Sequence, residues 1–165
     1  MKRVTGIGGI FFKAEDAPAL QGWYKRHLGI DVQPWGGAVF TWTDGEGKPA
    51  AGTTIWSIGS AQADQFAPSS AAFMVNYRVE DLCELVKVLR EEGCNVLEKI
   101  DESEYGKFAW VIDPEGNKVE LWQPPPANER DGLSAVNRWI LSHTRLHGTG
   151  VTGAHDASDA SGALR

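Results

Sequence analysis

The most informative part of the sequence is VIDPEGNKVELW, which occupies Val111–Trp122. Two short apolar runs flank the turn-forming residues DPEGN. Pro114 presets the backbone φ that an early turn position needs, and Gly116 supplies the positive φ of a tight reversal. Asp113 and Asn117 have side chains that bond to nearby backbone groups. The segment therefore predicts a β-hairpin.

The second strand of this hairpin carries a candidate site. Because successive side chains of a strand point to opposite faces, Val119 and Leu121 face one way, and Glu120 and Trp122 face the other. A carboxylate and an indole then share one face, which indicates a binding or catalytic site. The alternative is that Glu120 lies on the solvated side of an edge strand.

Composition limits the classes of function. With 165 residues, 42% of them apolar, the chain predicts a single domain. The net charge of −6, without a basic run, argues against a nucleic acid or an anionic membrane as a partner. The sequence has neither a membrane-spanning apolar stretch nor a signal-peptide core, so a cytoplasmic protein is expected. Cys83 and Cys94 fit neither a disulfide framework nor a metal motif.

The order of predicted elements occurs twice. In each half a strand and a helix precede three strands, and a polar linker at 61–69 separates the halves. Gly29 corresponds to Gly93, and Trp56 corresponds to Trp122. This duplication predicts two βαβββ modules, at about 4–59 and 70–124. The predicted strands are 4–13, 31–34, 38–42, 53–58, 72–79, 95–100, 107–112 and 118–123, and the predicted helices are 16–28 and 80–93.

The C-terminal part differs from both modules. The two modules form a domain at 1–126, a helix is predicted at 127–147, and residues 148–165 have the composition of a disordered tail. His143 and His147 have a spacing that can hold a metal from one helix face, but no third ligand is near them in the sequence.

Two segments resemble a known family. WYKRHLG at 23–29 and IDPEGNKVEL at 112–121 are similar to motifs of the vicinal oxygen chelate superfamily, which includes glyoxalases, bleomycin-resistance proteins and extradiol dioxygenases. The resemblance covers about Val4 to Pro124. It implies an α+β fold in which the two βαβββ modules form curled mixed sheets around a cleft.

The resemblance also implies metal ligands on the first and last strand of each module. These positions correspond to Gly9, Thr54, Met74 and Glu120. Only Glu120 is a good ligand for a divalent ion, and one carboxylate does not hold such an ion against water. We therefore expect no metal site and no cofactor, although a divalent metal remains the alternative.

The cleft is expected to have aromatic walls. The period of two along each strand groups the side chains in pairs, such as Glu120 with Trp122, and a pocket of this kind suits a flat organic ligand. The alternative is that some rings face the helices as ordinary core. The candidate ligand-binding residues are Phe40, Trp42, Trp56, Met74, Asn76, Phe108, Trp110, Glu120 and Trp122.

Two functions of different class follow. The first is metal-independent binding of a small organic or aromatic molecule in the cleft, as in the bleomycin-resistance proteins. The alternative is a glyoxalase-type lyase, isomerase or dioxygenase, in which Glu120 is the general base or part of a non-standard metal site. The sequence leaves open whether a reaction is catalysed, and whether the cleft forms within one chain or across a homodimer.

Overall fold

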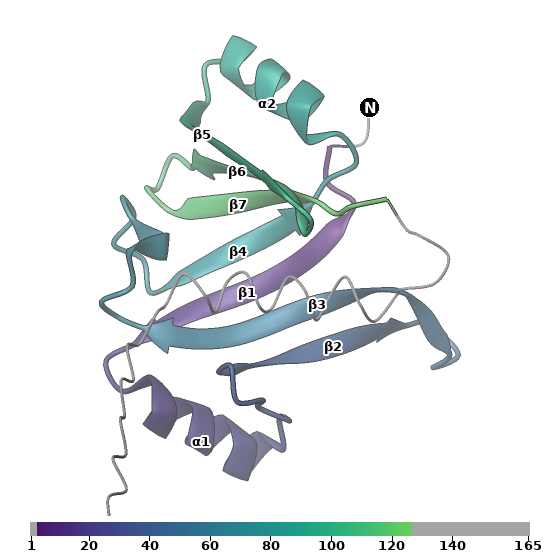
Figure 1. Cartoon of the computed structure of the whole chain (residues 1–165), viewed down its shortest axis with the longest axis vertical. Coiled ribbons are helices and arrows are strands. Elements are labelled where there is room, and N and C mark those ends of the chain that lie inside the picture. The colour runs from purple at the N-terminus through teal and green to yellow at the C-terminus, as the bar shows by residue number, and fades with distance from the viewer. Residues whose placement is uncertain (1–2, 127–165) are drawn as a thin grey trace, which may run out of the picture.

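The computed structural model describes residues 3–126, which form one mixed sheet with an α-helix near each end of it (Figure 1). The elements in chain order are β1 (Gly6–Ala14), α1 (Ala17–Leu28), β2 (Gly37–Thr43), β3 (Pro49–Ser60), the short 3-10 helix η1 (Asp64–Phe66), β4 (Phe73–Arg78), α2 (Leu82–Glu91), β5 (Asn95–Ser103), β6 (Gly106–Ile112) and β7 (Lys118–Gln123).

The strands form a single curled, open sheet in the order β2-β3-β1-β4-β7-β6-β5. The first strands of the two modules, β1 and β4, pair antiparallel at its centre. Within each module the first and last strands pair in parallel, β1 with β3 and β4 with β7. The predicted α+β architecture is confirmed, and the centre of the sheet is where the two modules meet.

Local sequence signals explain both helices. The side chains of Asp16 and Asp81 accept hydrogen bonds from the backbone N–H of Ala19 and Glu84, as N-cap residues do. Gly29, with a φ of 65°, ends α1. The two helix starts are therefore equivalent positions in the two modules.

The predicted hairpin is also confirmed. One oxygen of Asp113 accepts hydrogen bonds from the backbone N–H groups of Glu115 and Asn117, and Gly116 has a φ of 84°. These contacts turn the chain from β6 into β7 in register.

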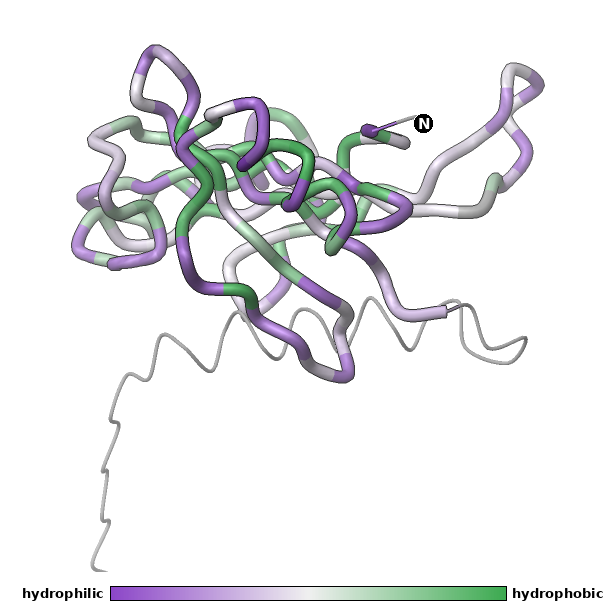
Figure 2. The backbone as a smooth tube through the Cα atoms, turned by 90° about the horizontal axis from the view of Figure 1, so that it is seen from above, coloured by the Kyte–Doolittle hydropathy of each residue, from purple (hydrophilic) through white to green (hydrophobic). Residues whose placement is uncertain are grey.

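Along the tube in Figure 2 the hydrophilic colour is concentrated at turns and the hydrophobic colour along parts of the strands.

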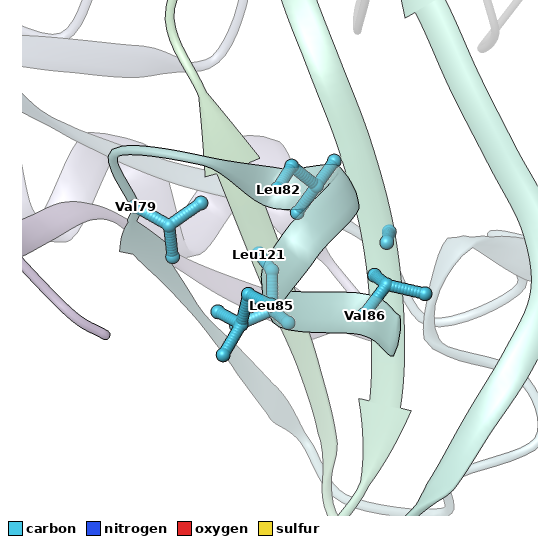
Figure 3. Close-up of a cluster of buried hydrophobic side chains, with 6 residues drawn as sticks. Val79, Leu82, Leu85, Val86 and Leu121 are labelled. Atoms are coloured by element: carbon cyan, nitrogen blue, oxygen red, sulfur yellow. The ribbon is translucent and has the colours of Figure 1, made fainter. Parts of the chain in front are cut away.

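Both helices cover the same face of the sheet, which we call the helix face. α2 packs on β6 and β7 through a cluster of apolar side chains, and Figure 3 shows Leu82, Leu85 and Val86 of the helix gathered near Leu121. α1 packs in the same way on β2 and β3. Its cluster contains Ala17, Ala38, Trp56 and Ile58. Leu121 and Glu120 are neighbours in one strand, so Glu120 points to the other face.

The opposite face, which we call the open face, has its own apolar cluster. Phe66 of η1 is 1% exposed and packs there with Phe11, Met74 and Phe108. The segment 61–69 was predicted to be only a polar linker, and this was wrong. A single aromatic residue in a polar stretch is enough to bind that segment to the sheet.

One predicted strand is not formed. Residues 31–34, expected as a strand of the first module, are irregular, so the sheet has seven strands and the first module has one strand fewer than the second. The backbone N–H of Gly36 donates to the carbonyl of Gln33, and Gly36 has a φ of 89°. The chain turns there into β2. The backbone carbonyl of Gln33 accepts within this turn, so it is not available for pairing with a neighbouring strand. The predicted C-terminal helix at 127–147 and tail at 148–165 lie outside the described residues.

Candidate functional site

The candidate site lies on one row of residues across the centre of the open face. Gly9 of β1, Asn76 of β4, Glu120 of β7 and Trp110 of β6 are successive partners in the sheet register. Directly paired residues of neighbouring strands point to the same face. The topology therefore brings an amide, a carboxylate and an indole of the second module together, beside β1 of the first module.

Glu120 and Asn76 form a buried polar pair. Glu120 is 1% exposed and Asn76 is 0% exposed. The Asn76 Nδ2 donates to Glu120 Oε1 at 2.7 Å, and the Trp110 Nε1 donates to Glu120 Oε2 at 2.9 Å. Both oxygens of the carboxylate thus accept hydrogen bonds from neutral donors, and these two bonds fix the orientation of the carboxylate. The interpretation of Glu120 as a solvated edge residue is wrong.

Within the described part of the chain, one of the two polar side-chain atoms of Asn76 is buried without a hydrogen-bond donor. Among the described residues, its Oδ1 is a buried side-chain atom that no hydrogen-bond donor reaches. A buried acceptor without a donor costs about 1–3 kcal/mol. Buried polar atoms of this kind are rare, and a ligand that donates a hydrogen bond is one way to satisfy them.

Gly8 makes room for this amide. A Cβ atom at Gly8 would lie 2.1 Å from Asn76 Oδ1 and 2.9 Å from the Trp122 ring, too close for any real side chain. The register between β1 and β4 shifts between Ile7 and Gly9, which marks a β-bulge. The bulge and its glycine are therefore part of the site, because a Cβ atom at position 8 would displace the Asn76 amide.

Lys118 is a functional candidate that the sequence analysis missed. It lies on β7 two residues before Glu120, on the same face, and is 9% exposed. Its Nζ donates to the backbone carbonyl of Gln65 at 2.7 Å and lies 5.2 Å from the centre of the Trp110 ring. Burial lowers the pKa of Lys118, nearby Glu120 raises it and Lys99 lowers it further. The period of two that assigned Glu120 and Trp122 could have assigned this residue as well.

Much of the predicted aromatic wall is packed core. Met74 and Phe108 lie on the open face as expected, but they are 3% and 4% exposed within the cluster around Phe66. Trp122 stacks on Phe108 with ring centres 6.3 Å apart, and its Nε1 donates to the carbonyl of Tyr105 at 2.9 Å. These residues pack together on the open face, where Trp110 and Trp122 are partly exposed.

Three predicted residues do not join this set. Trp56 lies under α1, with its ring centre 5.0 Å from that of Tyr24. The expectation that it shares the face of Glu120 was wrong, because the chain pairs Trp56 with Ala38 in a register that turns its ring to the helix face. Phe40 is 46% exposed on the edge strand β2. Trp42 donates to Thr54 Oγ1 at 2.8 Å and lies under Arg78, away from the row described above.

The structure also corrects the expected set of metal positions at Thr54. Phe11 lies five residues before the N-cap residue Asp16, and Asn76 lies five residues before the N-cap residue Asp81. Their parallel partners are Ser57 and Glu120. We call Phe11, Ser57, Asn76 and Glu120 the corrected positions. Of the expected positions, Gly9 and Met74 lie on the open face with Glu120, whereas Thr54 lies on the helix face. Thr54 came from the alignment of Trp56 with Trp122, which was wrong because the two rings lie on opposite faces.

The corrected positions do not fit a divalent metal. They offer one carboxylate, one amide and one hydroxyl, and the ring of Phe11 supplies no ligand atom. Within residues 3–126, no three His, Cys, Asp or Glu side chains come together as a possible metal site. His143 and His147 lie outside the described residues. In the same part of the chain, no helix is long and apolar enough to cross a membrane.

Comparison with known proteins gives a structural likeness but no sequence match. No protein-family model and no curated protein sequence match the chain. A variant of methylmalonyl-CoA epimerase from Streptomyces coelicolor, in complex with 2-nitronate-propionyl-CoA, aligns at a TM-score of 0.54 and 16% identity, over 76% of this chain and 98% of that one. Methylmalonyl-CoA epimerase with methylmalonyl-CoA and NH4+ aligns at 0.53 and 17%, over 74% and 96%.

A third solved structure is a glyoxalase/bleomycin resistance protein/dioxygenase superfamily member from Vibrio splendidus. It aligns at a TM-score of 0.46 and 15% identity, over 69% of this chain and 95% of that one. At such identities a structural likeness speaks for the fold and not for the reaction. The chain has the vicinal oxygen chelate fold.

Proposed function

We propose that this protein binds a small organic molecule on the open face without a metal ion, over Trp110 and Trp122 and beside Glu120. One observation carries the proposal: the buried Asn76 Oδ1 has no donor among the described residues, although the amide and its glycine are fitted closely to each other. The ligand supplies an N–H or O–H donor to this oxygen. Its flat, apolar part lies against the two indoles, as is usual in pockets for organic ligands.

The neutral dye N-phenyl-1-naphthylamine tests this proposal, because it combines an aromatic body with one N–H donor. The parent protein should bind it saturably, and the variant Glu120→Gln should fold normally but bind it about tenfold more weakly. In that variant the Gln amide donates to Asn76 Oδ1 once the Asn76 amide turns over, so the acceptor is no longer free for the dye. Dye fluorescence and urea unfolding measure the two quantities.

The control is Trp23→Ala, which removes a 48% exposed indole from α1 on the helix face. It should leave dye binding unchanged. The proposal fails if the parent shows no saturable binding. It also fails if Glu120→Gln binds the dye as tightly as the parent and the Trp23→Ala control do.

The metal-independent part of the proposal rests on the ligand set. Because Glu120 is the one carboxylate among the four corrected positions, protein purified without chelator should contain far less than one equivalent of any divalent ion. Elemental analysis by mass spectrometry measures this. A stoichiometric metal that is lost in Glu120→Ala would contradict it.

A second candidate function is proton transfer, with Glu120 as a general base. It is favoured by the way Asn76 and Trp110 fix both oxygens of a buried carboxylate. Two of the structural neighbours are named as methylmalonyl-CoA epimerases, so methylmalonyl-CoA in D2O is the appropriate probe. Deuterium incorporation that depends on Glu120 would favour this function over binding alone.

A further inference from the structure

Two ammonium groups lie over the ring that borders the proposed site. The Nζ atoms of Lys118 on β7 and Lys99 on β5 lie 5.2 Å and 5.8 Å from the centre of the Trp110 ring on β6. Strands β5 and β7 both pair with β6, one on each side of it. The positive charges therefore reach the indole from both neighbouring strands.

The two lysines differ in how their charge is balanced. The side chain of Lys99 is 70% exposed and its Nζ forms an ion pair with Asp101 at 2.8 Å. Lys118 is buried, and of the ion pairs that the described residues make, none involves Lys118. Its hydrogen bond goes to the neutral carbonyl of Gln65. An ammonium group has three N–H donors, so this carbonyl uses one of them.

Glu120 does not serve as the ion-pair partner of Lys118. Its two oxygens accept hydrogen bonds from Asn76 and Trp110. The charge of Glu120 raises the pKa of Lys118, whereas burial and Lys99 lower that pKa. Burying an ammonium group without a bonded anion is costly. A ligand that brings a negative charge to Lys118 would reduce this cost.

We propose that Lys118 forms an anion subsite, so that the ligand of the open face is a small organic anion whose carboxylate or phosphate group bonds to Lys118 over the Trp110 ring. This inference rests on the proposed binding function and adds the charge of the ligand to it. Asn76 is the cross-strand partner of Glu120, and Lys118 lies two residues before Glu120 in the same strand. One ligand beside Glu120 can therefore bring a donor to Asn76 Oδ1 and an anionic group to Lys118. Trp110 itself is partly exposed.

Two dyes with the same body test the subsite. 8-Anilinonaphthalene-1-sulfonate is N-phenyl-1-naphthylamine with one added sulfonate, so their affinity ratio reports on the anion alone. The parent should prefer the sulfonate dye about tenfold. Lys118→Met keeps the length of the side chain and removes its charge, and it should bring the ratio of the two dye affinities close to one.

Lys25→Met is the matched control, because Lys25 is an exposed lysine of α1 on the helix face. It should keep the preference. Raising the salt concentration with the parent protein gives a second measurement that needs no variant, and it should weaken the sulfonate dye more than the neutral one. Benzoate and phenyl phosphate, as competitors, then show whether a carboxylate or a phosphate is held more tightly.

The inference and the proposed function fail in different ways. If neither dye binds saturably, the proposed function is overturned and the subsite with it. If the neutral dye binds but the sulfonate dye is not preferred, or if Lys118→Met and Lys25→Met keep the same preference, only the anion subsite is overturned. Failure of both competitors to displace the sulfonate dye would also count against it.

Discussion

Replacing Gly8 with alanine should lower the free energy of unfolding by about 2–5 kcal/mol, a larger effect than most single methyl groups have. The added Cβ would lie 2.1 Å from Asn76 Oδ1 and 2.9 Å from the Trp122 ring. The amide would have to leave Glu120, so a buried hydrogen bond would be lost in addition to the steric cost. Urea unfolding followed by circular dichroism measures the change.

Gly22→Ala is the matched control for this prediction. Gly22 lies inside α1, and a Cβ there would meet no atom within 4 Å. This substitution should stabilise the protein by about 0.5–1 kcal/mol, because alanine loses less backbone freedom than glycine in a helix. If Gly8→Ala is as well tolerated as Gly22→Ala, the Asn76 amide does not lie where the structure places it.

The second large effect is expected for Asn76→Leu. The substitution removes the Nδ2 donor of a carboxylate that is 1% exposed, and it should cost about 2–4 kcal/mol in stability. Asn95→Leu, at an exposed position of β5, should change stability by less than about 0.5 kcal/mol.

A double-mutant cycle separates the pair from simple packing. When Glu120→Met is added to Asn76→Leu, the protein should lose less stability than the sum of the single changes, with a coupling energy of at least about 1 kcal/mol. Two apolar side chains can pack where one buried carboxylate without its donor cannot. Strictly additive costs would show that Asn76 and Glu120 do not stabilise each other.

The parts of the fold that could be predicted from the sequence depend on short-range signals. The turn at Asp113–Asn117 and the caps at Asp16 and Asp81 each involve residues within four positions of one another, so one segment contains the whole cause. The period of two placed Glu120 and Trp122 on the same face for the same reason.

The parts that could not be predicted depend on pairing between distant strands. Trp56 and Trp122 are similar in sequence context, but each ring faces the side that its own register sets, and that register involves residues far along the chain. Likewise, nothing local shows that Gly8 lies beneath the amide of Asn76, because the contact crosses from β1 to β4 at a bulge. The side chains of the candidate site were therefore visible in the sequence of the second module, whereas the contribution of Gly8 from the first module became visible only in the structure.

An NMR titration of the indole N–H signals with N-phenyl-1-naphthylamine shows directly which face of the sheet binds the ligand. Trp110 and Trp122 lie beside Glu120 on the open face, whereas Trp56 is buried under α1, so one protein contains both the reporters and their control. We expect the signals of Trp110 and Trp122 to shift with a common saturation curve and that of Trp56 to stay in place. A shift of Trp56 with Trp110 unchanged would place the ligand on the helix face and overturn the proposed site.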